Sequence, residues 1–185
     1  MKSATMPPDI RIATARLLLR SPTEEDVEAI ACEINEMAVV RMLARVPFPY
    51  SRADAMDFLA SSRASAARGK DINLVITRDG AAIGCIGLAD HPAVNELGYW
   101  LGRAHWGQGL ATEAATAFVD WCFANLRIDT IRAGVFIDNP ASLRVQEKMG
   151  FVATGTSLRP SLARGEAVPH TDTLLTRDRF NGPAR

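Results

Sequence analysis

The chain has 185 residues, in which 21 lysines and arginines balance 21 aspartates and glutamates. This length suits one domain with a core of its own, and the zero net charge gives no reason to expect nucleic acid or an anionic membrane as a partner. Three widely spaced cysteines favour free thiols over a disulfide framework. No segment approaches the roughly 20 apolar residues of a membrane span, and residues 1–8 lack the apolar core of a signal peptide, so we expect a cytoplasmic protein.

The first third of the chain contains two patterns that begin helices. Thr23 with Asp26, and Ser51 with Asp54, place an acid three residues after a hydroxyl side chain, which is the arrangement of a capping box. Gly69 is the kind of residue that commonly ends a helix. The expected elements are a loose segment at 1–13, a strand at 14–20, and helices at 23–35, 38–43 and 51–69.

The middle third changes to runs of β-forming residues. Asp79-Gly80 between two such runs is the strongest short signal for a hairpin. A glycine turn, Gly107-Gln108-Gly109, then begins a helix whose apolar residues recur every three or four positions. The expected elements are strands at 73–77, 81–88 and 96–101, and a helix that ends near 123.

The last third alternates strands with a helix. Asn139-Pro140 begins this helix, because proline is favoured at the first helical position, and Gly150 ends it. The expected strands lie at 131–137, 151–156 and 173–175. The whole order of elements predicts one α/β (α+β) domain at 14–180, built on a mixed sheet with helices on both faces and followed by a tail at 181–185.

The segment around the glycine turn can bind an anion. Gly107 and Gly109 let the backbone approach a ligand closely, and the unpaired N–H groups of the first helical turn carry the positive end of the helix dipole. A pyrophosphate group meets both conditions, although glycines that only shape a turn give the same pattern. A Walker loop needs Gly-Lys-Ser/Thr, and a dinucleotide fingerprint needs glycine or alanine where Thr112 stands, so neither nucleotide pattern is met.

Three motifs in order carry a family resemblance. The sequence W-G-Q-G-L-A-T-E-A at 106–114 is followed by N-P-A-S at 139–142 and E-K-M-G-F at 147–151. The combination resembles the GNAT superfamily of N-acetyltransferases. T-A-R-L-L-L-R at 14–20 resembles its branch that includes the ribosomal-protein N-terminal (alanine/serine) acetyltransferases. The likeness spans 14–180 and implies the acyl-CoA N-acyltransferase fold, with a mostly antiparallel sheet of about seven strands.

The resemblance implies acetyl-CoA as the co-substrate and no metal. In this family the pantetheine arm bonds to a strand at a gap in the sheet, as an added strand would. By resemblance that strand holds Tyr99, Trp100 and Leu101, and Asn139 and Ser142 approach the pantetheine and the thioester. The amides expected to hold the pyrophosphate are those of Gly107, Gln108, Gly109, Leu110, Ala111 and Thr112.

Acetyl transfer to an amine needs a neutral nucleophile. A terminal amine has a pKa of roughly 8, so a general base is useful at neutral pH. The resemblance indicates Glu96, although a solvated carboxylate at a strand end gives the same pattern, and His105 and His91 are lesser candidates. Ser142 is the candidate acid, because Gln146 stands where many relatives have a tyrosine; a hydroxyl that only bonds backbone at a helix start is an equal alternative.

Other conspicuous side chains are expected to be structural. Cys85 lies among small β-forming residues and is expected to be a packed thiol. Trp106 replaces an arginine or glutamine common in the family, which alters coenzyme affinity without removing the backbone anion site. The aromatic residues expected in the core, with stacking on a base or on adenine as the alternative, are Tyr99, Trp100, Trp106 and Trp121. The region of Arg159, Arg164 and His170 is expected to be a solvated loop, with a substrate wall as the alternative.

The acceptor pocket is implied by resemblance at 37–50 and 159–170. The leading hypothesis for the acceptor is the α-amine of a protein or peptide, followed by a small-molecule amine such as an antibiotic or a polyamine. A coenzyme A-binding sensor or scaffold without turnover, and a nucleotide-binding module, are the alternatives from other classes. The oligomeric state is left open, with a homodimer among the options.

Overall fold

The computed structural model describes residues 9–89 and 93–182, which form one eight-stranded sheet in the order β1-β2-β3-β4-β5-β6-β8-β7. Neighbouring strands run antiparallel, except that β5 and β6 run parallel. The predicted mixed, mostly antiparallel sheet is therefore confirmed, with one strand more than expected. The strands are β1 (Arg11–Ala13), β2 (Leu18–Arg20), β3 (Ile72–Arg78), β4 (Ala81–Ala89), β5 (Glu96–Leu101), β6 (Thr130–Phe136), β7 (Val152–Ser161) and β8 (Glu166–Thr176).

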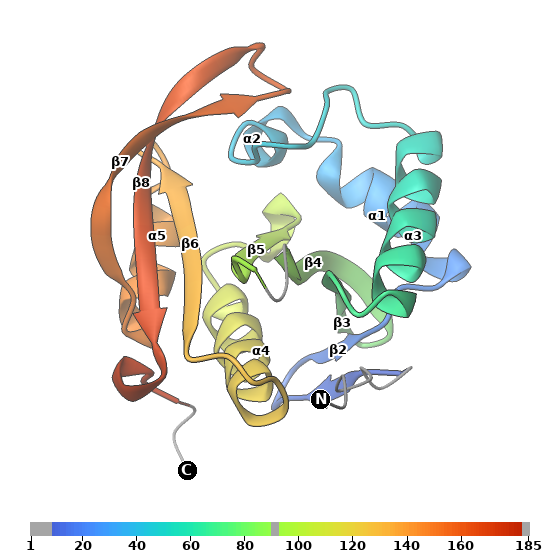
Figure 1. The fold of residues 1–185 in the computed structure, drawn as a ribbon. Helices are drawn as coiled ribbons and strands as arrows, with labels where there is room; N and C mark the ends of the chain where they lie inside the picture. The colour runs from blue at the N-terminus through green and yellow to red at the C-terminus, as the bar shows by residue number, and fades with distance from the viewer. Residues whose placement is uncertain (1–8, 90–92, 183–185) are drawn as a thin grey trace.

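Helices cover both faces of the sheet, as predicted (Figure 1). On one face α1, α2 and α3 bury apolar side chains against Val75 and Cys85. On the other face Phe118 of α4 and Met149 of α5 join the larger cluster. None of the helices within 9–89 and 93–182 combines the length and apolarity needed to cross a bilayer. The helices are η1 (Glu24–Asp26), α1 (Val27–Ile34), α2 (Met37–Val40), α3 (Arg52–Ala67), η2 (Arg103–His105), α4 (Leu110–Asn125), α5 (Pro140–Met149) and η3 (Arg177–Arg179).

Both predicted capping boxes are present. The Asp26 carboxylate accepts hydrogen bonds from the Thr23 amide at 2.8 Å and the Thr23 hydroxyl at 3.0 Å. Asp54 accepts from the amide and hydroxyl of Ser51 in the same way. Burial raises the pKa of Asp26, but hydrogen bonds from Arg20 and Thr23 outweigh burial and hold it below its usual value. Asp26 therefore fastens β2 to the start of α1 as an ionised group.

The N-terminal region differs from the prediction. The strand expected at 14–20 is confined to 18–20, and the segment expected to be loose supplies β1, which pairs with β2. The amide of Thr14 donates to the carbonyl of Leu17 at 2.9 Å, closing a tight turn between the two strands. The turn presents Thr14 and Arg16 to Glu113, a contact that no local pattern contains.

The C-terminal hairpin is longer than predicted. β7 and β8 pair from Val152 with Leu174 to Ser161 with Glu166, so most of 159–170, expected to be a solvated loop, lies in strands. Two prolines obscured this: Pro160 lies on the edge strand of the sheet, and Pro169 lies beyond the last pair of β8 with β6. Proline is tolerated at both kinds of position. The tip of the hairpin arches toward α2 (Figure 1).

Candidate active site

The sheet opens between its two parallel strands. The register of β5 and β6 contains one pair, Glu96 with Arg132, and the Arg132 amide donates to the carbonyl of Asn95 at 3.0 Å. Both strands line a cavity of about 1040 Å³. The backbone of β5 at 97–100 pairs with β4 on one side, and no strand of the described residues pairs with its other side, which can hydrogen-bond an extended ligand as an open sheet edge does.

The cavity brings together almost all of the residues that the sequence singled out. Gln108 is the exception, because its side chain accepts from Arg78 at 2.9 Å and donates to the Ala104 carbonyl at 3.0 Å. The predicted residues that line the cavity are Glu96, Tyr99, Trp100, Leu101, Gly107, Gly109, Leu110, Ala111, Thr112, Asn139 and Ser142.

The glycine turn has the backbone shape of an anion site. Gly107 and Gly109 have φ values of +73° and +76°, a region that side chains other than glycine rarely adopt. A Cβ on Gly107 would meet no atom of the described residues within 4 Å, so the space beside the turn is open. The first intrahelical bond of α4 runs from the Glu113 amide to the Gly109 carbonyl. The amides of 110–112 therefore have no intrahelical partner and stand at the positive end of the helix dipole.

Arg16 holds this turn from the N-terminal hairpin. Its guanidinium donates to the Gln108 carbonyl at 2.9 Å and to the Glu113 carboxylate at 2.7 Å. The Thr14 hydroxyl donates to the same carboxylate at 2.6 Å. Burial raises the pKa of Glu113, but these hydrogen bonds outweigh it and the pKa is lowered. Arg16 thus joins the 14–20 motif to the T-E-A motif, a link that sequence reasoning missed because the two motifs lie far apart in the chain.

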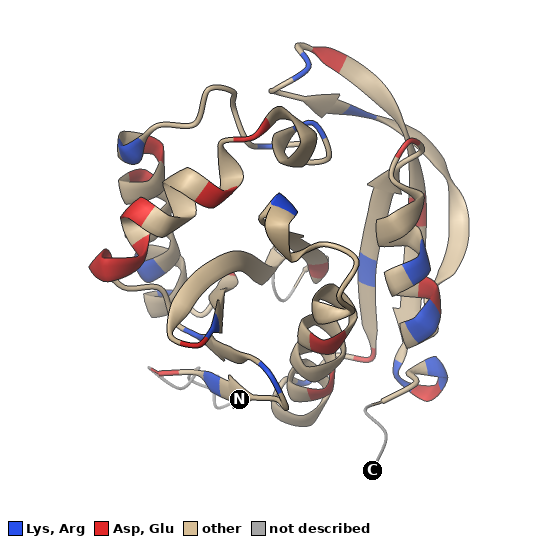
Figure 2. Ribbon diagram, turned by 180° about the vertical axis from the view of Figure 1, so that it is seen from behind, with Lys and Arg blue, Asp and Glu red and all other residues tan. Residues whose placement is uncertain are grey.

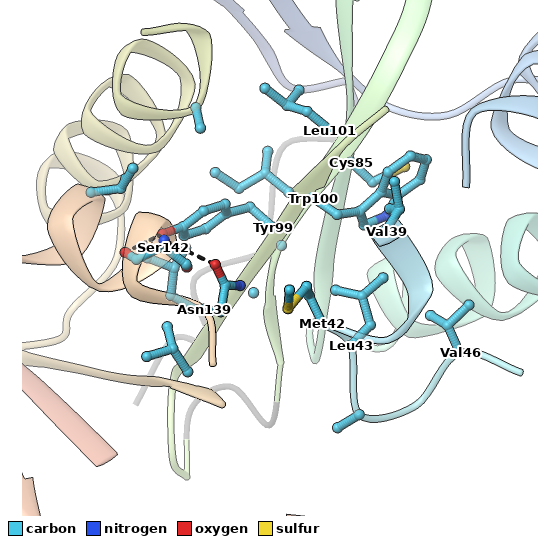
Figure 3. A pocket seen from close by; sticks show the side chains of 18 of the residues that line it. Val39, Met42, Leu43, Val46, Cys85, Tyr99, Trp100, Leu101, Asn139 and Ser142 are labelled. Carbon is cyan, nitrogen blue, oxygen red and sulfur yellow. Dashed lines mark hydrogen bonds between the residues drawn. The ribbon is translucent and has the colours of Figure 1, made fainter. Parts of the chain in front are cut away.

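The second helix start in the cavity belongs to α5. Asn139 caps it, accepting a hydrogen bond from the Ser142 amide at 3.2 Å, and Pro140 occupies the first helical position. The side chain of Tyr99 points from β5 toward Ser142 (Figure 3), and the two hydroxyl oxygens lie 2.9 Å apart. Because Asn139 supplies the cap, the Ser142 hydroxyl is free of that role and has Tyr99 as its partner.

The phenol of Tyr99 was not predicted as a site group. Burial raises its pKa to about 12, so it stays protonated at neutral pH. Leu97 and Tyr99 lie two residues apart on β5 and therefore face the same side of the sheet, where α4 and α5 pack. This spacing was the signal in the sequence that could have placed the Tyr99 phenol beside the start of α5. Gln146, at the position where the family resemblance led us to look for a tyrosine, is buried and is hydrogen-bonded to Thr173 at 2.7 Å and to the Gly134 carbonyl at 3.4 Å.

Glu96 lies on the opposite face of β5 from Tyr99, by the alternation of the strand. Two arginines from separate elements contact its carboxylate: Arg45 Nη2 lies 3.5 Å from Oε2, and Arg159 Nη1 lies 3.1 Å from Oε1. Its side chain is 21% exposed. A Cβ on Gly98, the next residue on this face, would lie more than 4 Å from the other described residues, which leaves open space beside the carboxylate.

A second group of charges lies beside the cavity, which Asp138 lines. Asp138 accepts from Arg41 at 2.7 Å and from both terminal nitrogens of Arg164 at 2.9 Å; these three residues are called the clasp below. Arg164 also donates to the Arg41 carbonyl at 2.7 Å, and the Leu162 amide donates to the Ala44 carbonyl at 3.0 Å. Hydrogen bonds from Arg164 lower the pKa of Asp138. The hairpin tip is therefore fastened to α2 and the loop that follows it, residues 37–46, which are called the α2 segment below.

The structure also places the other side chains that the sequence singled out. His105 lines the cavity with Nε2 3.7 Å from the Glu33 carboxylate, and His91 lies outside the described residues. Trp106, expected in the core, is instead 44% exposed at the rim, where its indole donates to the Leu101 carbonyl at 2.8 Å. Cys85 is a buried thiol, as predicted, and burial raises its pKa. Among the described residues, no group of three or more His, Cys, Asp or Glu side chains could hold a metal ion.

Comparison with known proteins agrees with this geometry. Residues 16–152 match the family model described as an acetyltransferase (GNAT) domain. The uncharacterized N-acetyltransferase YoaA of Bacillus subtilis is 35% identical over 150 residues, which cover 78% of this chain and 84% of YoaA.

Two solved structures share the fold. Mycobacterium smegmatis RimJ in complex with CoA-disulfide has a TM-score of 0.80 at 22% identity, covering 94% of this chain and 88% of that chain. Spermidine N-acetyltransferase from Vibrio cholerae, in complex with CoA and spermine, has a TM-score of 0.76 at 18% identity, covering 90% of this chain and 98% of that chain. With the match of the family model and of YoaA, the chain belongs to the GNAT family and is an acetyl-CoA-dependent N-acetyltransferase.

Proposed function

We propose that this enzyme transfers the acetyl group of acetyl-CoA to the α-amine of a protein or peptide. The observation that supports this most directly is the cavity at the gap between β5 and β6. The helix starts of α4 and α5 contribute to it from one face of the sheet, and Glu96 contributes from the other. An anionic coenzyme and an amine can therefore meet between the two strands.

The coenzyme half fits the parts of acetyl-CoA. A pyrophosphate suits the unpaired amides of 110–112 and the open backbone at Gly107 and Gly109. An extended pantetheine arm suits the side of β5 at 97–100 that faces away from β4. Bound acetyl-CoA supplies an activated thioester carbonyl.

Glu96 is the proposed base. It takes a proton from the ammonium group, the neutral nitrogen forms a bond to the thioester carbon, and the carbon–sulfur bond breaks. The second proton that the nitrogen loses on becoming an amide passes to the departing thiolate, which leaves as the free thiol. An α-amine, with a pKa of roughly 8, gives up its proton more easily than a lysine side chain with a pKa of roughly 10.4. This difference favours an α-amine as the acceptor.

Ser142 is the proposed hydrogen-bond donor to the departing sulfur. A thiol has a pKa of roughly 8.5 and leaves readily as a thiolate, so a hydrogen bond is enough to assist it. The protonated Tyr99 phenol lies 3.2 Å from the Ser142 carbonyl oxygen and 2.9 Å from Ser142 Oγ. When the phenol donates to Oγ, the serine proton is left to turn toward the sulfur.

A small polyamine is the second candidate acceptor. The cavity wall near α3 contains Asp54, Asp57 and Asp71, which would attract a second ammonium group, and the spermidine N-acetyltransferase shares the fold. We place the reaction in the cytoplasm, where the three free cysteines stay reduced.

Release of the coenzyme thiol tests the proposal. The purified enzyme is given acetyl-CoA with one of three acceptors: a peptide with a free α-amine and no lysine, the same peptide α-acetylated but with one lysine, or spermidine. We expect the free α-amine to give the highest kcat/KM. Faster release with spermidine would replace the first candidate by the second. Coenzyme binding with no thiol release from any amine would identify a sensor.

A further inference from the structure

Two arginines converge on the proposed base from different parts of the chain. Arg45 comes from the loop after α2, and Arg159 comes from β7. They contact the two different oxygens of Glu96, at 3.5 Å and 3.1 Å. All three side chains line the cavity, and the arginine side chains are 71% and 41% exposed. Their guanidinium groups can therefore reach a ligand in the same space as the amine.

The charge balance at this point changes when an amine arrives. Glu96 has one negative charge between two guanidinium groups, and Asp172, the other acid near Arg159, is 3.8 Å away and lies 2.9 Å from His170. An ammonium group that approaches Glu96 places a third cation beside one carboxylate. Like charges crowded together are costly. A negative group on the same substrate would restore the balance.

We infer that Arg45 and Arg159 form a carboxylate-binding subsite, and that the acceptor carries a carboxylate within a few bonds of its reacting amine. The inference rests on the proposed function and narrows its substrate class. The ammonium displaces the arginines from Glu96, and the substrate carboxylate receives them. Guanidinium groups bind carboxylates through paired hydrogen bonds, which suits this exchange.

The charged residues of the clasp and of the α3 cap have partners of their own. Arg41 and Arg164 are held in the clasp by Asp138. On the α3 side, Asp54 accepts hydrogen bonds from Ser51 in a helix cap. Arg45 has a more exposed side chain than Arg41, Arg159 or Arg164, so it has the greatest freedom to turn toward a ligand.

Two sources could supply the carboxylate. One is the α-carboxylate of a free amino acid, and the other is an aspartate side chain at the N-terminus of a peptide. Each has an uncharged partner of nearly the same shape: the amino acid amide, and the peptide that begins with asparagine. The ratio of kcat/KM within each pair measures the carboxylate alone.

The experiment compares these ratios in wild type, Arg45→Gln, Arg159→Gln and the double variant. Arg63→Gln is the matched control, because Arg63 is an exposed arginine paired with Glu24 and is not among the residues that line the cavity. We expect wild type and control to prefer the acid over its amide by about 10- to 100-fold in at least one pair, the range of hydrogen bonds to a charged group. The ratio should fall toward one in the double variant, with coenzyme affinity unchanged by calorimetry.

The pair that shows the preference identifies the source of the carboxylate. Equal rates for acid and amide in both pairs, while amines are still acetylated, would overturn the subsite and leave the proposed function standing. A preference that survives in the double variant would also overturn it. Absence of thiol release with every amine would contradict the proposed function itself, and the subsite with it.

Discussion

We propose that one half of the cavity binds the coenzyme and the other half the acceptor, and these two halves differ in what supplies their polar groups. The coenzyme half is built from backbone amides at a glycine turn and at two helix starts, and Arg16 serves to hold that backbone in place. The acceptor half is built from charged side chains that come from the α2 segment, β5 and the β7–β8 hairpin. Figure 2 shows basic positions on the hairpin and on the neighbouring α2 segment.

This difference determines how strongly each half depends on the identity of its side chains. Backbone amides are present whatever the side chains are, so we expect the coenzyme half to depend little on the identity of the side chain at Trp106. Side-chain charges change with single substitutions, so the acceptor half can acquire new substrates without disturbing the fold. Variants in the two halves should therefore fail in different ways.

The largest expected effect is in the acceptor half. Glu96→Gln keeps the shape of the side chain but removes the base, and turnover should fall by about 10²- to 10⁴-fold. Coenzyme affinity should stay unchanged. Glu36→Gln is the control, because Glu36 pairs with Arg103 and is not among the cavity-lining residues. Equal turnover in Glu96→Gln and wild type across pH 6 to 9 would remove Glu96 from the mechanism.

The next effect is in the coenzyme half. Gly109→Glu places a negative side chain beside the amides of 110–112, and the like-charge cost of several kcal/mol predicts a loss of coenzyme affinity of roughly 10²- to 10³-fold. Backbone strain without the charge is tested by Gly109→Gln, which places a side chain of the same size at the same φ of +76°. Calorimetry should show that only the first variant loses binding. Comparable losses in both would mean that strain, not charge, is responsible.

A smaller effect is expected where the two halves meet. Tyr99→Phe and Ser142→Ala should each lower kcat by about 5- to 10-fold with little change in the KM for acetyl-CoA, the size expected for one hydrogen bond made in the transition state. The double variant should be no slower than Ser142→Ala, because Tyr99 acts through Ser142. Single-turnover rates at full coenzyme occupancy provide the measurement. Full speed in Ser142→Ala would leave the serine with a structural role.

The smallest effect concerns stability. Asp138→Asn removes the charge at the centre of the clasp and should cost about 0.5–1 kcal/mol at pH 7, as expected for partly exposed ion pairs. Because the folded-state pKa of Asp138 is lowered, its contribution is present above the unfolded-state pKa of roughly 3.9 and is lost as pH falls through the folded-state value.

Urea unfolding at pH 7 and at pH 3 measures this. The difference between Asp138→Asn and wild type should shrink at the lower pH. Asp129→Asn, at a side chain that is 94% exposed, is the control and should change neither value. A difference that grows as pH falls would contradict the assignment of the clasp as a stabilising contact.

The sequence predicted what depends on local patterns. The capping boxes at Thr23 and Ser51, the hairpin turn at Asp79-Gly80 and the ends of α5 follow from residues a few positions apart, and the structure confirms them. The glycine turn and the Asn139 cap are also local patterns. They account for most of the predicted coenzyme residues, and nearly all of these residues line one cavity.

Contacts between distant segments could not be predicted in this way. Arg159 reaches Glu96, and Arg16 reaches Glu113, across many residues of intervening chain. The hairpin at 159–170 was mistaken for a loop because its polar, proline-containing strands resemble loop sequence, and pairing with β6 and docking on the α2 segment decide its structure.

The single register pair between β5 and β6 makes the sheet incomplete without its ligand. A pantetheine arm in the gap would complete the ladder, so the open side of β5 should exchange its amide protons quickly in the free enzyme and slowly in the complex. At a hundred times its dissociation constant, the coenzyme would add about 2.7 kcal/mol to the free energy of unfolding. In a cell where proteases degrade opened molecules, the amount of this enzyme would then follow the supply of acetyl-CoA.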